Sequence, residues 1–230
     1  MKRFWRAASV VEHGEEYAVE LDGRPVKTPA RVPLAVPTRR LAEAIVAEWD
    51  AQGETVDLRA MALTGLANAA IDRVAPDPAT FASGLAKFGE SDLLYYRVER
   101  PRRLVERQAA AWDPLLAWAR RRFDVDFMLG SGVMPVAQPQ ATVSALGHAI
   151  AAYDPFRLAA LSPLVTVGGS LIAALAVAEG TMSPAAAWDA VTIDEHFQLE
   201  EWGSDGEAEK ALAVRRADFD AGARLLSLLA

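Results

Sequence analysis

The chain reads YAVELDGRPVKTP over residues 17–29, and this stretch decides how its first third folds. Apolar and polar residues alternate from Tyr17 to Leu21, which is the period of a strand with one face in a core. Asp22 and Gly23 follow, and both tolerate the positive φ angles of a two-residue hairpin turn. Prolines interrupt residues 24–29 and 32–37 and remove backbone donors. We therefore expect a small antiparallel sheet with short or edge strands.

Helical spacing replaces the strand pattern after residue 37. Thr38 is a typical N-cap residue, and Leu41, Ile45 and Trp49 follow it at the spacing of one helix face. A second helix is expected over residues 61–74, with its apolar residues on one side. A sheet covered by two helices is an α+β unit.

Two prolines within three residues, Pro76 and Pro78, mark the expected domain boundary. We predict an α+β domain over residues 1–76, with a small antiparallel sheet and two helices, followed by an all-α domain over residues 77–230. In the second domain we expect a short helix opened by Asp154-Pro155 and another capped by Ser183 ahead of Pro184. The longer helices expected there cover residues 78–89, 104–123, 138–153, 163–179 and 205–229. The pair Gly168-Gly169 lies inside the fourth of these, where it would allow another helix to pack closely.

Composition restricts the class of function. The 230 residues are 52% hydrophobic, which is enough for a sizeable core, and they carry a formal net charge of −7. That charge argues against a protein that binds nucleic acid. The chain contains no Cys, which excludes disulfides, thiolate metal sites and Cys nucleophiles.

One uncharged stretch, residues 158–178, is as long as a membrane span. Pro163, Gly168 and Gly169 interrupt it, so a buried helix is the better interpretation. The first residues, Met1 to Arg6, are basic but lack the apolar region of a signal peptide. We expect no membrane insertion.

The sequence IDEHFQLEEWG at residues 193–203 places four carboxylates, a His and two aromatic residues in one predicted helix. At about 100° per residue, Glu195 falls on the same side as Leu199 and Trp202, opposite Ile193 and Phe197. A carboxylate in apolar surroundings is costly unless it is paired, so we expect Glu195 to be partly buried and paired, for example with an Arg. The residues expected to face solvent are Asp194, Gln198 and Glu201.

The same segment allows alternative functions. Its cluster of Asp194, His196, Glu200 and Glu201 could serve a hydrolase, although one helix rarely supplies both an acid and a base. His196 and Glu200 are too few ligands for a metal site, so no metal is expected. The sequence contains no nucleotide-binding, cofactor-binding or catalytic Ser motif. The remaining alternative is a protein-binding domain with aromatic residues at its interface.

Four pieces of the sequence carry a family resemblance. They are VELDGRPVKTP at residues 19–29, AEWDAQ at 47–52, NAAID at 68–72, and DEHFQLEEWG at 194–203, followed by EAE at 207–209. In this order they resemble the ATP12 family of F1-ATPase assembly chaperones. The resemblance implies an N-terminal α/β domain, a C-terminal helical domain, and binding to the unassembled F1 α subunit, which prevents its aggregation until it meets the β subunit. It also implies that the chain is not an enzyme and uses no cofactor.

The resemblance also implies sites and a location. The family's critical acidic residue corresponds to Asp194 or Glu195, and both stay open, while Trp49 is expected in the core of the first domain. We expect a monomer in the bacterial cytoplasm, or in the mitochondrial matrix if the source is eukaryotic. A hydrolase or an interaction domain for another client remains the alternative. The implied signature or partner-binding residues are Asp194, Glu195, Gln198, Glu201, Trp202, Gly203, Trp49, Asp50 and Asp72.

Overall fold

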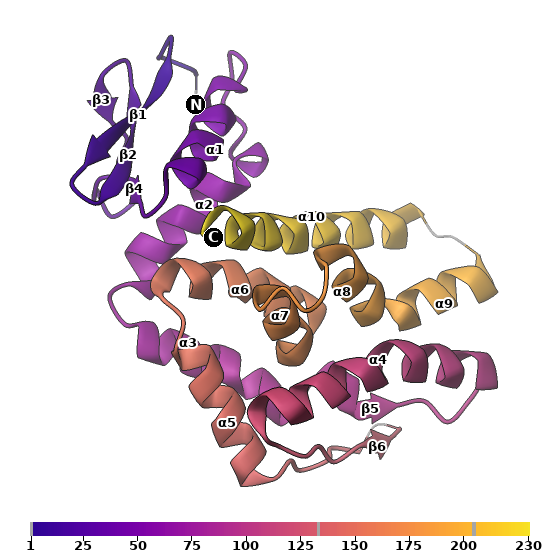
Figure 1. Ribbon diagram of the computed structural model, residues 1–230. Helices are drawn as coiled ribbons and strands as arrows, with labels where there is room; N and C mark the ends of the chain where they lie inside the picture. The colour runs from indigo at the N-terminus through magenta and orange to yellow at the C-terminus, as the bar shows by residue number, and fades with distance from the viewer. Residues whose placement is uncertain (1, 133, 204–205) are drawn as a thin grey trace. The chain divides into compact units, whose positions relative to one another are not determined.

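The computed structural model describes residues 2–132, 134–203 and 206–230. The chain forms two compact units (Figure 1). The first contains the chain up to Pro78 together with Asp154–Ala160 and Arg224–Ala230, and the second contains Ala79–Tyr153 and Leu161–Ala223. A small antiparallel sheet with helices comes first along the chain and a helical region follows, so the predicted fold class is confirmed.

The sheet of the first unit is built around one central strand. Strand β2 (Glu16–Leu21) pairs antiparallel with each of the other three, and its register with β1 places Ala8 opposite Leu21. The other strands are β1 (Ala8–His13), β3 (Arg24–Pro25) and β4 (Ala35–Val36). Asp22 and Gly23 have φ angles of 49° and 75°, so they form the predicted hairpin turn between β2 and β3.

Helix α1 (Arg39–Asp50) packs on this sheet (Figure 1). The Thr38 side chain accepts a hydrogen bond from the Leu41 backbone N–H, which confirms the predicted N-cap. The helix predicted over residues 61–74 is observed in two parts, because its second half widens into a π-helical turn. These parts, with the 3-10 turn before them, are η1 (Leu58–Ala60), α2 (Ala62–Ala69) and η2 (Ala70–Val74).

Two segments from far along the chain complete the core of the first unit. Ala160 and Leu225 are fully buried in the same apolar cluster as Leu41 and Ile45. The Thr38 hydroxyl also donates a hydrogen bond to the carbonyl oxygen of Leu228, at 2.7 Å. The N-cap of α1 therefore ties the helix to a segment about 190 residues later.

Among its described residues, the second unit consists of helices, loops and one short parallel strand pair. Its central helix, α7 (Leu171–Ala178), is almost wholly apolar, and residues 171–176 are all buried. The 3-10 turns and strands are η3 (Lys87–Glu90), η4 (Leu93–Tyr95), β5 (Tyr96–Arg97) and β6 (Gly130–Ser131). The other helices are α3 (Pro78–Ala86), α4 (Arg102–Phe123), α5 (Gln140–Ala151), α6 (Pro155–Gly168), α8 (Pro184–Val191), α9 (Ile193–Trp202) and α10 (Gly206–Leu228). The predicted start of the last helix, Asp205, lies outside the described residues.

The helix predicted over residues 163–179 is wrong as a single element. Gly169 has a φ angle of +70°, which ends α6, and the Ser170 side chain caps the new helix α7 by accepting from the Ala173 N–H. The close packing expected at Gly168 does not require a glycine, since a Cβ atom there would lie 3.4 Å from the Phe219 ring, which is an ordinary van der Waals contact. Among the described residues, no helix is long and apolar enough to cross a membrane.

Asp92 joins two parts of the second unit from a fully buried position. Its carboxylate accepts hydrogen bonds from the backbone N–H groups of Leu94 and Ile172, both at 3.0 Å. Burial raises the pKa of Asp92 to about 6, although these hydrogen bonds oppose the rise. The ionised form of Asp92 is therefore costly in the folded chain.

We expect the stability of the chain to depend on the charge of Asp92. The pKa in the folded state exceeds the unfolded value of about 4. The protonated Asp92 side chain therefore makes its full contribution to the free energy of unfolding below about pH 4. This contribution is lost as the pH rises through about 6, where Asp92 ionises in the folded chain. Relative to Asp92→Asn, the wild-type free energy of unfolding should fall by roughly 3 kcal/mol over this window, as measured by urea unfolding. A difference between the two proteins that does not change with pH would contradict the raised pKa.

Candidate protein-binding groove

Helices α9 and α10 of the second unit line an open groove of about 490 Å³. Its floor is apolar, formed by side chains of Leu199 and Leu212 with small residues beside them. The Glu195–Arg215 pair also lines the groove. The full lining comprises Glu195, Gln198, Leu199, Trp202, Gly203, Ala208, Ala211, Leu212 and Arg215.

Trp202 is the most exposed large apolar side chain of the described residues, at 81% of its full surface. It is the last residue of α9, and Gly203 ends the helix with a φ angle of +85° that a side chain would disfavour. A Trp ring has about 150–250 Å² to bury, so leaving it in water forgoes a large stabilisation. Exposed aromatic residues beside apolar grooves are typical of protein interfaces.

Glu195 is half-buried and paired, as predicted. Its carboxylate accepts a hydrogen bond from an Arg215 guanidinium nitrogen at 2.9 Å. The same guanidinium donates to the carbonyl oxygen of Val167 and lies over the Trp188 ring, 5.9 Å from its centroid. Glu195 therefore joins α9 to α10 through an Arg that is itself fixed by other helices.

Asp194 faces solvent only in part, which differs from the prediction. Its carboxylate is half-buried and accepts a hydrogen bond from the Gln108 amide of α4 at 2.8 Å. Burial raises the pKa of Asp194, while the Gln108 hydrogen bond lowers it and the nearby Glu195 raises it further. Asp194 lies next to the Ile193 and Phe197 side of the helix, and that side packs on its own unit.

The remaining polar residues of α9 lie at the surface. Gln198 and Glu201 are exposed, as predicted. Glu201 pairs with Arg103 of α4 at 3.1 Å, and the neighbouring Glu200 pairs with Arg107 at 2.7 Å. The hydrogen bond from Arg107 lowers the pKa of Glu200. The Arg-rich start of α4 therefore balances the acidic end of α9.

The three signature residues of the first unit have structural contacts. Trp49 is buried in the core, as predicted, and meets the Trp5 ring edge-to-face at 5.0 Å. Asp50 accepts a hydrogen bond from the Ala8 N–H at 3.2 Å. Asp72 accepts from the Thr28 hydroxyl at 2.6 Å and from the Ala30 N–H at 2.9 Å. Both carboxylates fix strands or loops of the sheet to the helices.

The cluster considered for a hydrolase does not line the groove of α9 and α10. Asp194, His196, Glu200 and Glu201 all lie outside the lining of the groove. Three of these carboxylates are bonded to Gln108, Arg107 or Arg103 instead. Across the part of the chain that the structure describes, no group of three or more His, Asp or Glu residues could hold a metal ion.

The contribution of α10 to the groove was not predicted from the sequence. Ala208, Ala211, Leu212 and Arg215 recur at the spacing of one helix face, which is a signal for an apolar stripe that ends in a charge. This spacing predicts an apolar face on α10, but it does not indicate that Glu195 of α9 lies opposite that face.

Known proteins match 88–100% of the chain, and a family model matches its first half. The family model described as "ATP12 chaperone protein" matches residues 2–120. The crystal structure of Atp12 from Paracoccus denitrificans, and that of an Asp-to-Lys mutant of it, are 42% identical, with 99% of this chain and 97% of theirs covered at a TM-score of 0.93. The Atu1473 protein of Agrobacterium tumefaciens is 39% identical, with 100% and 86% covered at a TM-score of 0.94. A mitochondrial atp12 protein of Schizosaccharomyces pombe is 25% identical over 215 residues, which are 88% of this chain and 74% of that protein.

These matches, together with a groove that suits a protein partner, place the chain among molecular chaperones. It belongs to the ATP12 chaperone family, as the four sequence pieces predicted.

The contact between α9 and α10 can be tested by a double-mutant cycle. Glu195→Gln, Arg215→Met and the double variant should give a coupling energy of about 0.5–1 kcal/mol in urea unfolding, because the pair is partly shielded from water. The matched control is Arg102–Glu106 on α4, an exposed pair that should couple by only about 0.3–0.5 kcal/mol. A coupling no larger than the control would mean that Glu195 and Arg215 do not join the helices.

Proposed function

We propose that the chain is an assembly chaperone that binds the unassembled α subunit of the F1 sector of ATP synthase. In this proposal it covers the interface that the α subunit later offers to the β subunit, and so prevents aggregation. Membership of the ATP12 family supports the class of function. The observation that supports a client site in this chain is Trp202, 81% exposed beside the apolar groove of α9 and α10.

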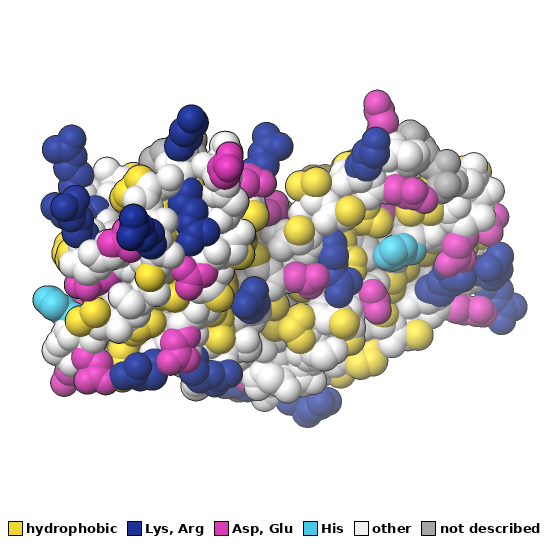
Figure 2. Space-filling view, turned by 90° about the horizontal axis from the view of Figure 1, so that it is seen from above, with side chains coloured by type: hydrophobic (Ala, Val, Ile, Leu, Met, Phe, Trp, Pro, Cys, Tyr) yellow, Lys and Arg dark blue, Asp and Glu magenta, His cyan; other side chains and the backbone are white. Residues whose placement is uncertain are grey.

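The chemistry of the groove fits a client surface rich in apolar and basic groups. Trp202 and Leu199 offer apolar area, which supplies most of the binding free energy at interfaces. The net charge of −7 favours encounter with basic surfaces without requiring tight binding. Figure 2 shows acidic and basic side chains interspersed on the face drawn, with apolar side chains between them, so the steering comes from the overall charge and not from one patch on that face.

The proposal includes the state and location of the protein. It acts as a monomer without a cofactor and catalyses no reaction. It works where the α subunit is made, which we propose is the bacterial cytoplasm. The identities of 42% and 39% to proteins of Paracoccus and Agrobacterium, against 25% to the fission yeast protein, support a bacterial source.

Co-expression with the α subunit of the same organism tests the proposal. We expect more soluble α subunit than in its absence, and a complex of the two that co-purifies. The β subunit, expressed in the same way, is the control client and should gain nothing. If α neither gains solubility nor co-purifies, the proposal fails. Recovery of other proteins in place of α would select an interaction domain for another client.

A further inference from the structure

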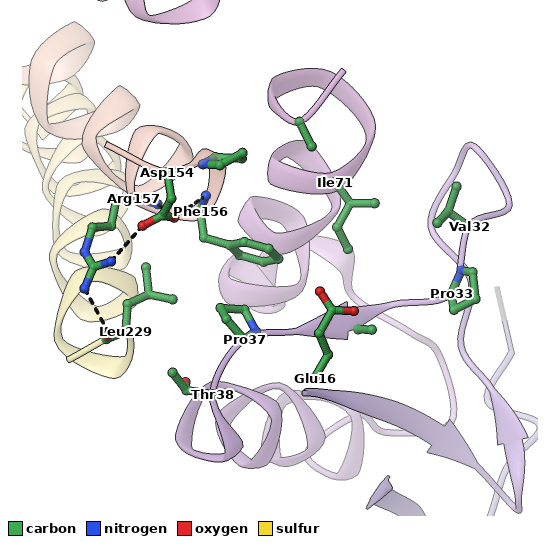
Figure 3. A pocket seen from close by; sticks show the side chains of 13 residues that line it. Glu16, Val32, Pro33, Pro37, Thr38, Ile71, Asp154, Phe156, Arg157 and Leu229 are labelled. Carbon is green, nitrogen blue, oxygen red and sulfur yellow. Dashed lines mark hydrogen bonds and ion pairs between the residues drawn. The ribbon is translucent and has the colours of Figure 1, made fainter. Parts of the chain in front are cut away.

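The first unit contains a second groove, of about 500 Å³, that the proposed function does not use. Its walls come from the start of β2, the loop before α1, the π-helical turn η2 and the first turn of α6 (Figure 3). The lining comprises Glu16, Val32, Pro33, Ala35, Pro37, Thr38, Ile71, Ala75, Asp154, Pro155, Phe156, Arg157 and Leu229.

Apolar side chains form most of this lining. Phe156, half-buried, lies in Figure 3 between Pro37 and the helix that carries Ile71. Val32 is 45% exposed on the opposite wall. Small-molecule sites commonly bury 70–90% of their ligand, whereas five lining residues of this groove are exposed to water, namely Glu16, Val32, Pro33, Pro37 and Ala75. An extended protein segment, which presents side chains to a groove and leaves its backbone in solvent, suits this shape better.

Two of the three charged groups in the lining neutralise each other. The Asp154 carboxylate accepts from the Arg157 guanidinium at 2.7 Å and from the backbone N–H groups of Phe156 and Arg157, at 2.9 and 3.0 Å. Arg157 also donates to the carbonyl oxygen of Leu229 at 3.2 Å. These bonds fix the first turn of α6, and the two charges compensate each other there.

Glu16 is the charged group that remains. It is exposed at the start of β2, and its carboxylate points into the open space of the groove in Figure 3. The residues that the structure describes offer this carboxylate no ion pair. An apolar groove with one unpaired carboxylate at its wall is complementary to an apolar side chain that stands next to a cation.

We infer that this groove binds an extended segment of a partner protein in which an apolar side chain stands beside a Lys or Arg. The apolar side chain covers Phe156 and Ile71, and the cation meets Glu16. This site lies in the first unit and does not depend on the groove of α9 and α10. It therefore stands or falls separately from the binding of the F1 α subunit.

Short fluorescent peptides test this inference with the full chain. One peptide carries Leu-Lys between Gly and Ser residues, and two matched peptides carry Ala-Lys or Leu-Glu. We expect the Leu-Lys peptide to bind, and each replacement to weaken binding by about tenfold in fluorescence anisotropy. Val32→Ser, which removes apolar area at an exposed wall residue without adding a charge, should also weaken binding of the Leu-Lys peptide.

A charge swap makes the test specific. Glu16→Lys should weaken the Leu-Lys peptide by about tenfold and strengthen the Leu-Glu peptide, because the unpaired charge of the wall is reversed. Glu15→Lys makes the same change one residue earlier, outside the lining, and should leave both affinities unchanged. The inference is overturned if no peptide binds, if Ala-Lys binds as well as Leu-Lys, or if the Glu15 and Glu16 variants behave alike.

Discussion

Replacing Trp202 by Ser is expected to weaken the complex with the F1 α subunit by about 2 kcal/mol, or roughly thirtyfold in Kd. The ring is 81% exposed in the free chain, so its apolar surface is available to a client. For the same reason the substitution removes few contacts within the chain, and the free energy of unfolding should change by less than about 0.5 kcal/mol. Binding is measured by capture of refolding α subunit on immobilised chaperone, and stability by urea unfolding.

Val214→Ser is the matched control for this prediction. Val214 is also an exposed apolar residue, at 64%, and it lies on α10, but it does not line the groove. The control variant should capture the α subunit as well as wild type does. If the two variants lose the same amount of α-subunit binding, the effect comes from general surface hydrophobicity. If the Trp202 variant binds as tightly as the wild type, the groove is not part of the proposed client site.

Local signals in the sequence predicted much of the fold because they act over a few residues. The Asp22-Gly23 turn and the Thr38 cap depend on the φ angles and hydrogen bonds of neighbouring residues, and both are observed as predicted. Ser183 likewise caps α8 ahead of Pro184. Each of these features can be inferred from its residue types alone.

Features that depend on distant residues were not predictable in the same way. The break between α6 and α7 is not one of them, because Gly169 and the Ser170 cap are local signals that the prediction of a single helix overlooked. The helical wheel indicated that Glu195 needs a partner, but it did not indicate Arg215.

The helical wheel of α9 also placed Asp194 between the two apolar faces of the helix. Only the structure shows that Gln108 on α4 is its hydrogen-bond partner and that its carboxylate is half-buried. Sequence alone therefore located the candidate site on α9 but not its second wall.

Phe219→Ala is expected to lower the free energy of unfolding by about 3–5 kcal/mol, the largest stability effect that we predict. Phe219 is fully buried in α10, and its ring meets the Trp188 ring edge-to-face at 5.4 Å. It also covers Gly168, where α6 ends, so truncation leaves a cavity that three helices would have to fill. Urea unfolding measures the loss, and Phe219→Leu, which keeps most of the volume, should lose less than half as much.

The Phe219 and Trp202 variants together separate stability from binding. Phe219 is buried away from the groove lining, so the Ala variant should still capture the α subunit under conditions where it remains folded. The Trp202 variant should show the opposite pattern, with normal stability and weak capture. If Phe219→Ala costs less than about 1 kcal/mol, α10 is not fixed by this contact. If the folded Phe219→Ala variant fails to capture the α subunit, binding also depends on the packing that positions α10. The reason is that a groove with one movable wall cannot hold Trp202 in a defined place.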